Sequence, residues 1–260
     1  MKNWEPSYRR QMALKEQIRD NTNLLKFQKR AVGSSEIGSQ FYCEEKVELA
    51  YIYGTVETQE MLFGTEGHEK AVEDFVKVDL EDLWRHISEK GWRWIAETPF
   101  IMRCNNIFIV GRPDQILFVN SRPQLLFEFK FSTYTTTFPG QHVQAESYGL
   151  LLKESGFDTS SLFYAIVVLP HEIKDSNFLK ELPKKIAEEF FRKELFTQSS
   201  SKLYYDKINV FIQEFDQKQA EKDLGYALEY WLGLREAEGT DNPNKCRSCE
   251  LLAHCPKKPI

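Results

Sequence analysis

Two short segments near the middle of this 260-residue chain carry side chains that could bind a metal ion together. In FEFKFS, the alternation of side chains along a strand places Glu128 and Lys130 on one face and three phenylalanines on the other. In VGRPDQI, Pro113 cannot donate to a sheet ladder, so it indicates an edge, bulge or break in the strand beside Asp114. Two carboxylates on neighbouring strands form a site of oxygen ligands suited to Mg²⁺ or Mn²⁺. A lysine beside them can orient or deprotonate water, or stabilise charge on a scissile phosphate.

Three further polar residues are candidates for the same site. Gln144 and Tyr148 are four residues apart and share one face of a predicted helix, where they could contact a phosphate or position Lys130. His68 lies on the helix predicted before the strands, and as a third ligand its nitrogen would favour Mn²⁺ over Mg²⁺. Each pattern also has a purely structural explanation: a surface ion pair for Glu-x-Lys, a half-exposed helix face for the glutamine and tyrosine, and a packed side chain for the histidine.

Cysteines form a second candidate metal site. Of the five in the chain, three lie in CRSCELLAHC near the C-terminus, with the spacing C-x2-C-x5-C. A C-x2-C turn brings two sulfurs to the same side of one metal or cluster. An odd number of cysteines without a secretion signal argues against a disulfide framework. Three thiolates leave a four-coordinate site one ligand short, and the candidates for the fourth are Cys43, Cys104 and His254.

The composition excludes several classes of protein. Hydrophobic residues make up 42% and charged residues 28%, which rules out wholly disordered, collagen-like and low-complexity chains. No apolar run approaches the roughly 20 residues of a membrane span. The N-terminal MKNWEPSYRR lacks an apolar signal segment, so we expect a cytoplasmic protein with no membrane partner.

Charge is distributed unevenly along the chain. A formal net charge of −5 argues against a protein that coats nucleic acid by bulk charge, but it does not exclude one positive groove. Residues 1–30 carry eight basic and three acidic side chains. This run is either a solvated amphipathic helix or a basic helix bordering a phosphate path.

The elements that must position these residues indicate an α/β core. Apolar periodicity predicts helices over about 6–30, 44–53, 62–89, 139–155, 178–196 and 213–236, with GSSEIGSQFYC as a turn capped by Ser34 and Ser35. WRWIAETPFIM, NIFIVGRPDQILFV and QLLFEFKFS predict an antiparallel meander of three strands, SLFYAIVVL a buried strand, and residues 203–211 a short one. We therefore expect one mixed sheet flanked by helices in a single domain over 1–260, made of an N-terminal helical part (1–60), a core (61–212) and a C-terminal helix with the cysteines (213–260).

The order of the motifs resembles the PD-(D/E)XK nuclease superfamily in its RecB-like branch. The resemblance covers about residues 40–256 and rests on His68, Asp114, Glu128-x-Lys130, Gln144-x-x-x-Tyr148, one early cysteine and the C-terminal cysteine run. A short chain without a Walker motif is similar to the stand-alone CRISPR-associated iron–sulfur exonucleases. The resemblance implies a restriction-endonuclease-like core with N-terminal helices and a C-terminal iron–sulfur staple.

Roles for individual residues follow from the resemblance. It implies that His68, Asp114, Glu128 and the carbonyl of Phe129 bind the divalent metal, that Lys130 is the catalytic lysine, and that Gln144 and Tyr148 match the family's Gln-x-x-x-Tyr motif. It also implies that Cys43, Cys246, Cys249 and Cys255 hold a 4Fe–4S cluster, which leaves Cys104 as a small core residue.

The implied activity is metal-dependent hydrolysis of phosphodiester bonds at single-stranded DNA ends, and CRISPR spacer acquisition beside integrase proteins is one setting for it. Tyr42 and Trp92 are aromatic candidates for stacking on bases. Two other classes of protein would keep the cysteines. One is a catalytically silent DNA-binding protein stapled by an iron–sulfur cluster or by zinc, and the other is an electron-transfer protein.

Overall fold

The computed structural model describes residues 4–54, 80–171, 173 and 176–257. The helices of this part are α1 (Glu5–Arg19), α2 (Ser34–Gln40), α3 (Glu44–Tyr53), α5 (Leu80–Ser88), α6 (Pro139–Glu154), α7 (Ser176–Arg192), α8 (Gln217–Trp231) and α9 (Pro243–Arg247), with 3₁₀ turns at Lys26–Gln28, Leu195–Thr197 and Leu252–His254. The strands are β1 (Val32–Gly33), β2 (Trp92–Ala96), β3 (Phe100–Cys104), β4 (Ile107–Gly111), β5 (Gln115–Val119), β6 (Arg122–Phe131), β7 (Phe163–Leu169), β8 (Ser200–Tyr205) and β9 (Ile208–Glu214). The predicted α/β class is confirmed.

The strands form two sheets, so the prediction of one mixed sheet is wrong. A six-stranded sheet has the order β2-β5-β6-β7-β9-β8, and a three-stranded sheet has the order β1-β4-β3. In the larger sheet β6 and β7 are parallel and the other neighbours are antiparallel. In the smaller sheet β1 runs parallel to β4, while β3 and β4 are antiparallel. Both sheets are therefore mixed.

Two strand breaks account for the second sheet. Each of the first two predicted strands is divided, one into β2 and β3 and the other into β4 and β5. The second break lies around Pro113, as its missing N–H predicted. In the first break, the backbone N–H of Glu97 donates to the carbonyl oxygens of Pro113 and Asp114, at 3.1 and 3.2 Å. The two breaks thus face each other, and Asp114 lies where the chain turns from one sheet into the other.

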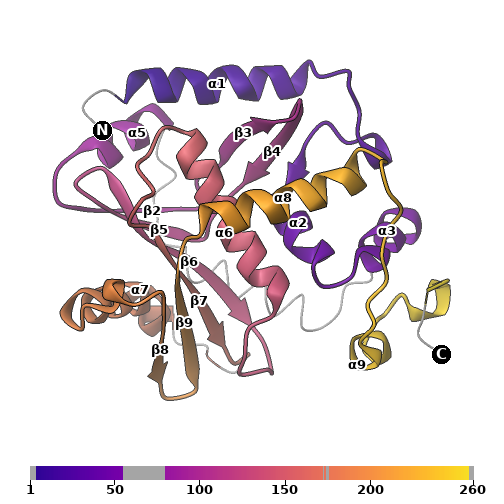
Figure 1. Ribbon diagram of the computed structural model, residues 1–260. Coiled ribbons are helices and arrows are strands. Elements are labelled where there is room, and N and C mark those ends of the chain that lie inside the picture. Colours follow the sequence, from indigo (N-terminus) through magenta and orange to yellow (C-terminus); the bar gives the residue numbers. More distant parts are fainter. Residues whose placement is uncertain (1–3, 55–79, 172, 174–175, 258–260) are drawn as a thin grey trace.

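Helices cover both faces of the six-stranded sheet (Figure 1). On one face, Phe190 of α7 belongs to the same buried apolar cluster as Phe127 and Phe129 of β6. Helices α6 and α8 cover the opposite face. Alternate residues of β6 therefore face different layers, as predicted, and Glu128 and Lys130 lie on the side of α6.

Most of the remaining predictions are confirmed in outline. Helix α3, helix α6 and the wholly buried strand β7 lie where the sequence predicted them. The single short strand predicted over 203–211 is instead the hairpin of β8 and β9. Helix α8 begins only at Gln217, because the carboxylate of Asp216 accepts hydrogen bonds from the next free backbone N–H groups and caps the helix there. Of the helix predicted over 62–89, only α5 lies within the described residues.

The N-terminal region differs from the prediction in two places. The helix predicted over 6–30 ends at Arg19, because Asn21 accepts a hydrogen bond from the N–H of Asn23 (3.0 Å), an Asx turn that competes with helix. The segment predicted as a turn contains α2. The carboxylate of Glu36, in the first turn of α2, accepts from the N–H of Gly33 (2.7 Å), which starts the helix.

Two glycines let α2 and α6 approach each other closely. A Cβ atom on Gly38 would lie 2.6 Å from the carbonyl oxygen of Gly140, and a Cβ atom on Gly140 would collide with the carbonyl group of Gly38. Both neighbours are backbone atoms, which cannot rotate away. The contact fixes α2 beside the helix that carries Gln144 and Tyr148.

Replacing Gly140 with alanine should lower the free energy of unfolding by about 2 kcal/mol, because the added methyl group overpacks the contact between the helices. Gly225 is the matched control, since it is exposed in α8 and no described atom lies within 4 Å of the position that a methyl group would take. There alanine should raise stability by about 0.5–1 kcal/mol through helix propensity. Urea unfolding of both variants measures the two effects. Equal stability of Gly140→Ala and the parent would contradict the close contact.

Candidate active site

Strand pairing brings the two predicted carboxylates together. In the antiparallel ladder of β5 and β6, Gln115 pairs with Phe127. Asp114 immediately precedes this pair and Glu128 immediately follows it, so the two lie on adjacent strands at the same level. Their exposed fractions are only 8% and 2%. The backbone N–H of Phe129 donates to Oδ2 of Asp114 at 2.6 Å, which ties the corner between the sheets to β6.

Lys130 and Gln144 complete a closed network around Glu128. Nζ of Lys130 lies 2.6 Å from Oε1 of Glu128 and 3.1 Å from Oε1 of Gln144. Nε2 of Gln144 donates to the same carboxylate oxygen at 2.7 Å and to the hydroxyl of Tyr148 at 2.8 Å. Of the two roles expected for the glutamine, the described contacts fit the positioning of Lys130. Asp114, Glu128, Lys130, Gln144 and Tyr148 therefore meet in one place.

The charges of this network set the protonation of its members. Burial lowers the pKa of Lys130, but the charge and hydrogen bond of Glu128, together with the charge of Asp114, outweigh burial and raise the pKa overall. Burial, and then the same two carboxylates, hold the pKa of Tyr148 well above its usual value. The site therefore presents an ammonium group and a neutral phenol at neutral pH, which favours a lysine that donates hydrogen bonds over one that removes protons.

These side chains line a cleft of about 400 Å³. Its lining residues are Gly33, Ser34, Ser35, Val110, Gly111, Arg112, Asp114, Glu128, Lys130, Gln144 and Tyr148. The wall formed by 33–35 was missed by sequence reasoning, which assigned the two serines only to capping. That wall depends on the pairing of Gly33 with Val110, between strands more than seventy residues apart. The two-residue strand β1 leaves no periodic pattern from which to predict it.

The structure describes one of the two other predicted metal ligands and not the other. His68 lies outside the described residues, so its place relative to the cleft is not described. Phe129 borders the site through its backbone, as its hydrogen bond to Asp114 shows, and the role of its carbonyl stays a prediction. Within the described residues, no three histidine, cysteine or carboxylate side chains stand in an arrangement that could already hold a metal ion. The paired carboxylates fit Mg²⁺ or Mn²⁺ by their donor chemistry, and some adjustment would accompany binding.

The four cysteines assigned to the cluster line one small cavity. Cys43, Cys246, Cys249 and Cys255 all contribute to it. Burial, followed by the charges of the other three thiols, raises the pKa of Cys246. Four thiols are the donor set of a 4Fe–4S cluster or of a structural zinc ion, but in the described structure they do not stand in an arrangement that already holds an ion. All of these cysteines are free thiols, so no disulfide joins them.

The cavity also decides among the open candidates for the fourth ligand. Cys43 lines it at the start of α3. Cys104, at the end of β3, packs against the main apolar cluster, as expected of a core residue. The ring of His254 stacks on Tyr53 with a centroid distance of 4.3 Å and does not line the cavity. Of the three candidates, only Cys43 therefore faces the C-terminal thiols.

A buried ion pair fastens the same two parts of the chain. Glu44, directly after Cys43, is 3% exposed, and both of its carboxylate oxygens lie 2.5 Å from the guanidinium of Arg235. The backbone N–H of Glu238 donates to the same carboxylate at 3.0 Å. Nearby, Lys46 and Glu250 form a second ion pair at 3.0 Å. Sequence reasoning missed these contacts, because nothing local indicates that α3 meets the C-terminal segment.

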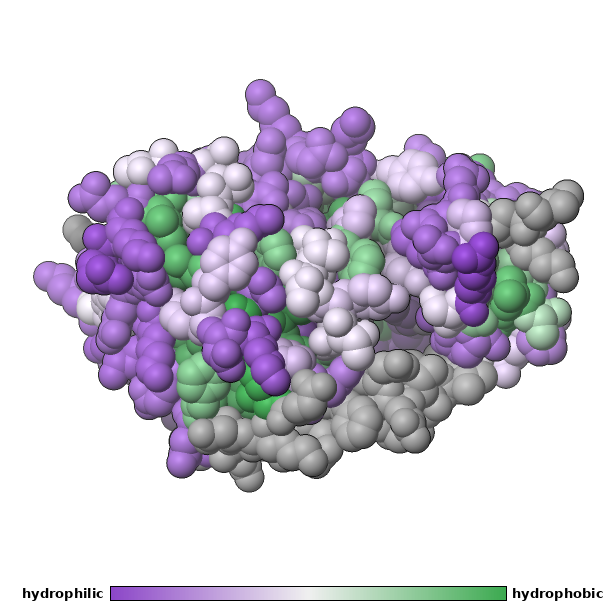
Figure 2. All heavy atoms as spheres, turned by 90° about the horizontal axis from the view of Figure 1, so that it is seen from below, coloured by the Kyte–Doolittle hydropathy of each residue, from purple (hydrophilic) through white to green (hydrophobic). Residues whose placement is uncertain are grey.

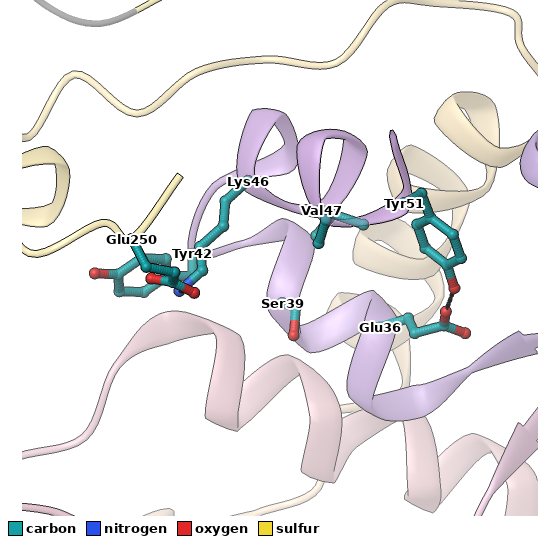
Figure 3. A pocket seen from close by; sticks show the side chains of 8 residues that line it. Glu36, Ser39, Tyr42, Lys46, Val47, Tyr51 and Glu250 are labelled. Atoms are coloured by element: carbon teal, nitrogen blue, oxygen red, sulfur yellow. Dashed lines mark hydrogen bonds and ion pairs between the residues drawn. The ribbon is translucent and has the colours of Figure 1, made fainter. Parts of the chain in front are cut away.

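A groove of about 570 Å³ lies between the cleft and the cysteine cavity. Figure 3 shows Tyr42, Lys46 and Glu250 at one end of the groove. At the other end, the hydroxyl of Tyr51 donates a hydrogen bond to the carboxylate of Glu36. Helix α2 contributes to both hollows, because Ser34 and Ser35 line the cleft while Glu36 and Ser39 line the groove. Tyr42 and Lys46 in turn line both the groove and the cysteine cavity.

The two aromatic residues predicted to stack on bases differ in their surroundings. The ring of Tyr42 lies under two ammonium groups, with Nζ of Lys245 and of Lys46 at 4.5 and 5.7 Å from its centroid. Trp92 pairs with Val119, at the end of the β2–β5 ladder remote from Asp114. Of the two, only the tyrosine therefore lines the groove and the cysteine cavity.

The surface seen from below carries many hydrophilic side chains with smaller hydrophobic patches among them (Figure 2). None of the helices in the described part of the chain combines the length and the apolar character needed to cross a membrane.

In comparisons with known proteins, no family model and no curated protein matches the chain. The resemblance to RecB-like nucleases therefore stays a prediction from the sequence motifs.

Helix α6 carries a second polar network on its other side. Glu146 is 5% exposed and accepts a long hydrogen bond of 3.5 Å from the hydroxyl of Tyr164, which also contacts Nδ1 of His142 at 3.1 Å. Burial, and then the charge of Asp223, raise the pKa of Glu146 to about 7. Folding therefore favours its protonated form.

This shift predicts a pH dependence of stability. A carboxyl group whose pKa is raised from 4.5 to about 7 stabilises the fold at pH values below its unfolded pKa, and this contribution is lost as the pH rises towards about 7. Glu146→Gln should therefore raise the melting temperature relative to the parent more at pH 8 than at pH 5. Glu188→Gln, the same change on an exposed part of α7, should show no such trend. A constant difference between parent and Glu146→Gln would contradict the raised pKa.

Proposed function

We propose that this protein is a metal-dependent deoxyribonuclease of the RecB-like PD-(D/E)XK type, which hydrolyses phosphodiester bonds at single-stranded DNA ends. The observation that carries the proposal is the convergence of Asp114, Glu128 and Lys130 in one cleft, with both carboxylates buried. Buried carboxylates beside an accessible cleft are costly in a purely structural role. The same proposal includes a restriction-endonuclease-like core and CRISPR spacer acquisition, beside integrase proteins, as a setting.

The side chains of the site have different roles in the proposed hydrolysis. Asp114 and Glu128 present oxygen atoms to Mg²⁺ or Mn²⁺, and His68 and the carbonyl of Phe129 are the further ligands of the proposal. A bound divalent ion supplies charge neutralisation to the phosphate and lowers the pKa of the attacking water. Lys130, as an ammonium group, donates hydrogen bonds to that water or to the phosphate.

Gln144 and Tyr148 keep the lysine in place. The amide of Gln144 contacts both Lys130 and Glu128, so the ammonium group is held close to the carboxylate while the rest of the cleft stays open. The phenol of Tyr148 orients that amide from the neighbouring turn of α6. These two residues act on the lysine, which in turn acts on the substrate.

The row of hollows along α2 and α3 supports a path for the DNA strand. The groove and the cysteine cavity share Tyr42 and Lys46 as lining residues, and the groove continues from the cleft along α2, where Ser35 lines the cleft and Glu36 lines the groove. Lys46 and Lys245 flank Tyr42 and provide positive charge beside a ring on which a base could stack. Lys46 is also paired with Glu250, and Glu36 lines the groove as well, so the positive charge beside the ring that is not paired with a described carboxylate comes from Lys245.

The thiol cavity supports the proposed 4Fe–4S cluster as a staple between α3 and the C-terminal segment. The alternative is a catalytically silent DNA-binding protein stapled by a cluster or by zinc. One observation favours it: Glu128 is already engaged by Lys130 and Gln144.

Cleavage of DNA separates these functions. Anaerobically purified protein should digest end-labelled single-stranded DNA with Mg²⁺ or Mn²⁺, and Asp114→Ala should be slower by about a hundredfold or more, because it loses a metal ligand. Lys130→Ala should also lose activity. Asp206→Asn, in the exposed turn between β8 and β9, is the control and should cut like the parent. If Asp114→Ala cuts as fast as the parent, the site is wrongly assigned.

Metal content tests the staple. The parent should be brown and contain iron and sulfide, and Cys246→Ser should lose most of both because one of four thiolates is missing. Cys104→Ser should keep them, since Cys104 lies outside the cavity. Zinc in place of iron would support a zinc staple. Equal iron in the two variants would contradict the assignment of Cys246.

A further inference from the structure

The hydroxyl of Ser34 is buried beside the cleft without a partner. Ser34 is 1% exposed, and among the described residues nothing forms a hydrogen bond with its Oγ. The same residue lines the cleft that holds Asp114, Glu128 and Lys130. A buried hydroxyl that has given up its hydrogen bonds with water normally finds a protein partner, so an orphaned one at a cleft indicates a ligand.

The fold holds Ser34 firmly in this position. Strand β1 fixes the preceding residue, because Gly33 pairs with Val110. The backbone of Gly111 leaves just enough room for the side chain: a Cβ atom there would lie 2.5 Å from Oγ of Ser34 and 2.8 Å from the ring of Tyr148. Glycine at 111 therefore lets the serine hydroxyl lie next to the tyrosine that supports Gln144.

The cleft has two chemically different sides. Asp114 and Glu128 can only accept hydrogen bonds while they are ionised, and they suit a cation. Ser34 and the exposed Arg112, which also lines the cleft, bring donors. A group that binds between the two sides must accept hydrogen bonds from these donors and must also present negatively charged oxygen atoms to the cation. A phosphodiester with two non-bridging oxygens has that chemistry.

We propose that Ser34 and Arg112 form a phosphate-binding subsite, in which Oγ–H of Ser34 donates to a non-bridging oxygen of the DNA phosphate next to Lys130. This inference deepens the proposed nuclease function and rests on it for the identity of the substrate. Arg112 supplies positive charge at the mouth of the cleft, and Ser34 supplies a fixed donor at its base. No covalent step involves the serine.

Ser34→Ala tests the subsite, and Ser155→Ala is the matched control. Ser155 is also 1% exposed, but its hydroxyl donates to the carbonyl of Leu151 at 2.7 Å and accepts from Gln11 at 3.0 Å. Ser34→Ala should leave the melting temperature unchanged or raise it, because no protein hydrogen bond is lost. It should slow cleavage of a single-stranded oligothymidylate by about tenfold, the effect of one hydrogen bond to a charged group. Ser155→Ala should lower the melting temperature and cut normally at a temperature where it is folded.

Two further measurements use altered conditions and altered DNA. With Ca²⁺ in place of Mg²⁺, fluorescence anisotropy of labelled oligothymidylate should show about tenfold weaker binding by Ser34→Ala. With a methylphosphonate at the scissile position, one of the two isomers lacks the oxygen that Ser34 contacts. For that isomer the parent and Ser34→Ala should cut at the same rate.

The outcomes separate the subsite from the nuclease function. A parent that cuts, with Ser34→Ala cutting and binding equally well, overturns the subsite and leaves the nuclease in place. A melting temperature that falls as far as in Ser155→Ala shows a structural hydroxyl and also overturns the subsite. Binding that depends on Ser34 without any cleavage overturns the nuclease and supports the subsite. A parent that neither binds nor cuts overturns both.

Discussion

The ion pair of the buried Glu128 with the half-buried Lys130 is the interaction on which the cleft depends. Taking both groups out of water is costly, and their attraction offsets that cost only when their remaining hydrogen-bonding positions are also satisfied. Gln144 contributes from α6 by donating to Oε1 of the carboxylate and accepting from the ammonium group. This network thus fixes the position of helix α6 relative to strand β6.

The rest of the fold serves to keep that position open on one side. The breaks at Glu97 and Pro113 turn β3 and β4 away from the large sheet, so Asp114 ends at a corner beside a cleft and not inside a continuous ladder. The contact between Gly38 and Gly140 then places α2 against α6 and completes the opposite wall. Each feature is local, and the residues that these features position line one cleft.

Local patterns predicted the residues of the site better than its walls. Alternation along β6 and the four-residue spacing in α6 have fixed geometry, so the neighbours of Glu128 could be inferred from the sequence. The C-x2-C turn similarly predicted a shared thiol cavity, although it left three candidates for the fourth ligand. Two contacts join residues far apart in the chain, the pairing of β1 with β4 and the ion pair of Glu44 with Arg235. No periodic sequence pattern indicates either contact. Ser34 was interpreted as a cap for the same reason.

The ion pair of Glu44 and Arg235 has a consequence for the proposed metal staple. The pair is buried, so salt screens it little, and it joins the start of α3 to the C-terminal segment without help from any cofactor. Cys43 and the three C-terminal cysteines are therefore kept within reach of one another on a scaffold that has already folded. A cluster or zinc ion held there would therefore bind to two parts of the chain that are already joined, and its removal would leave them connected.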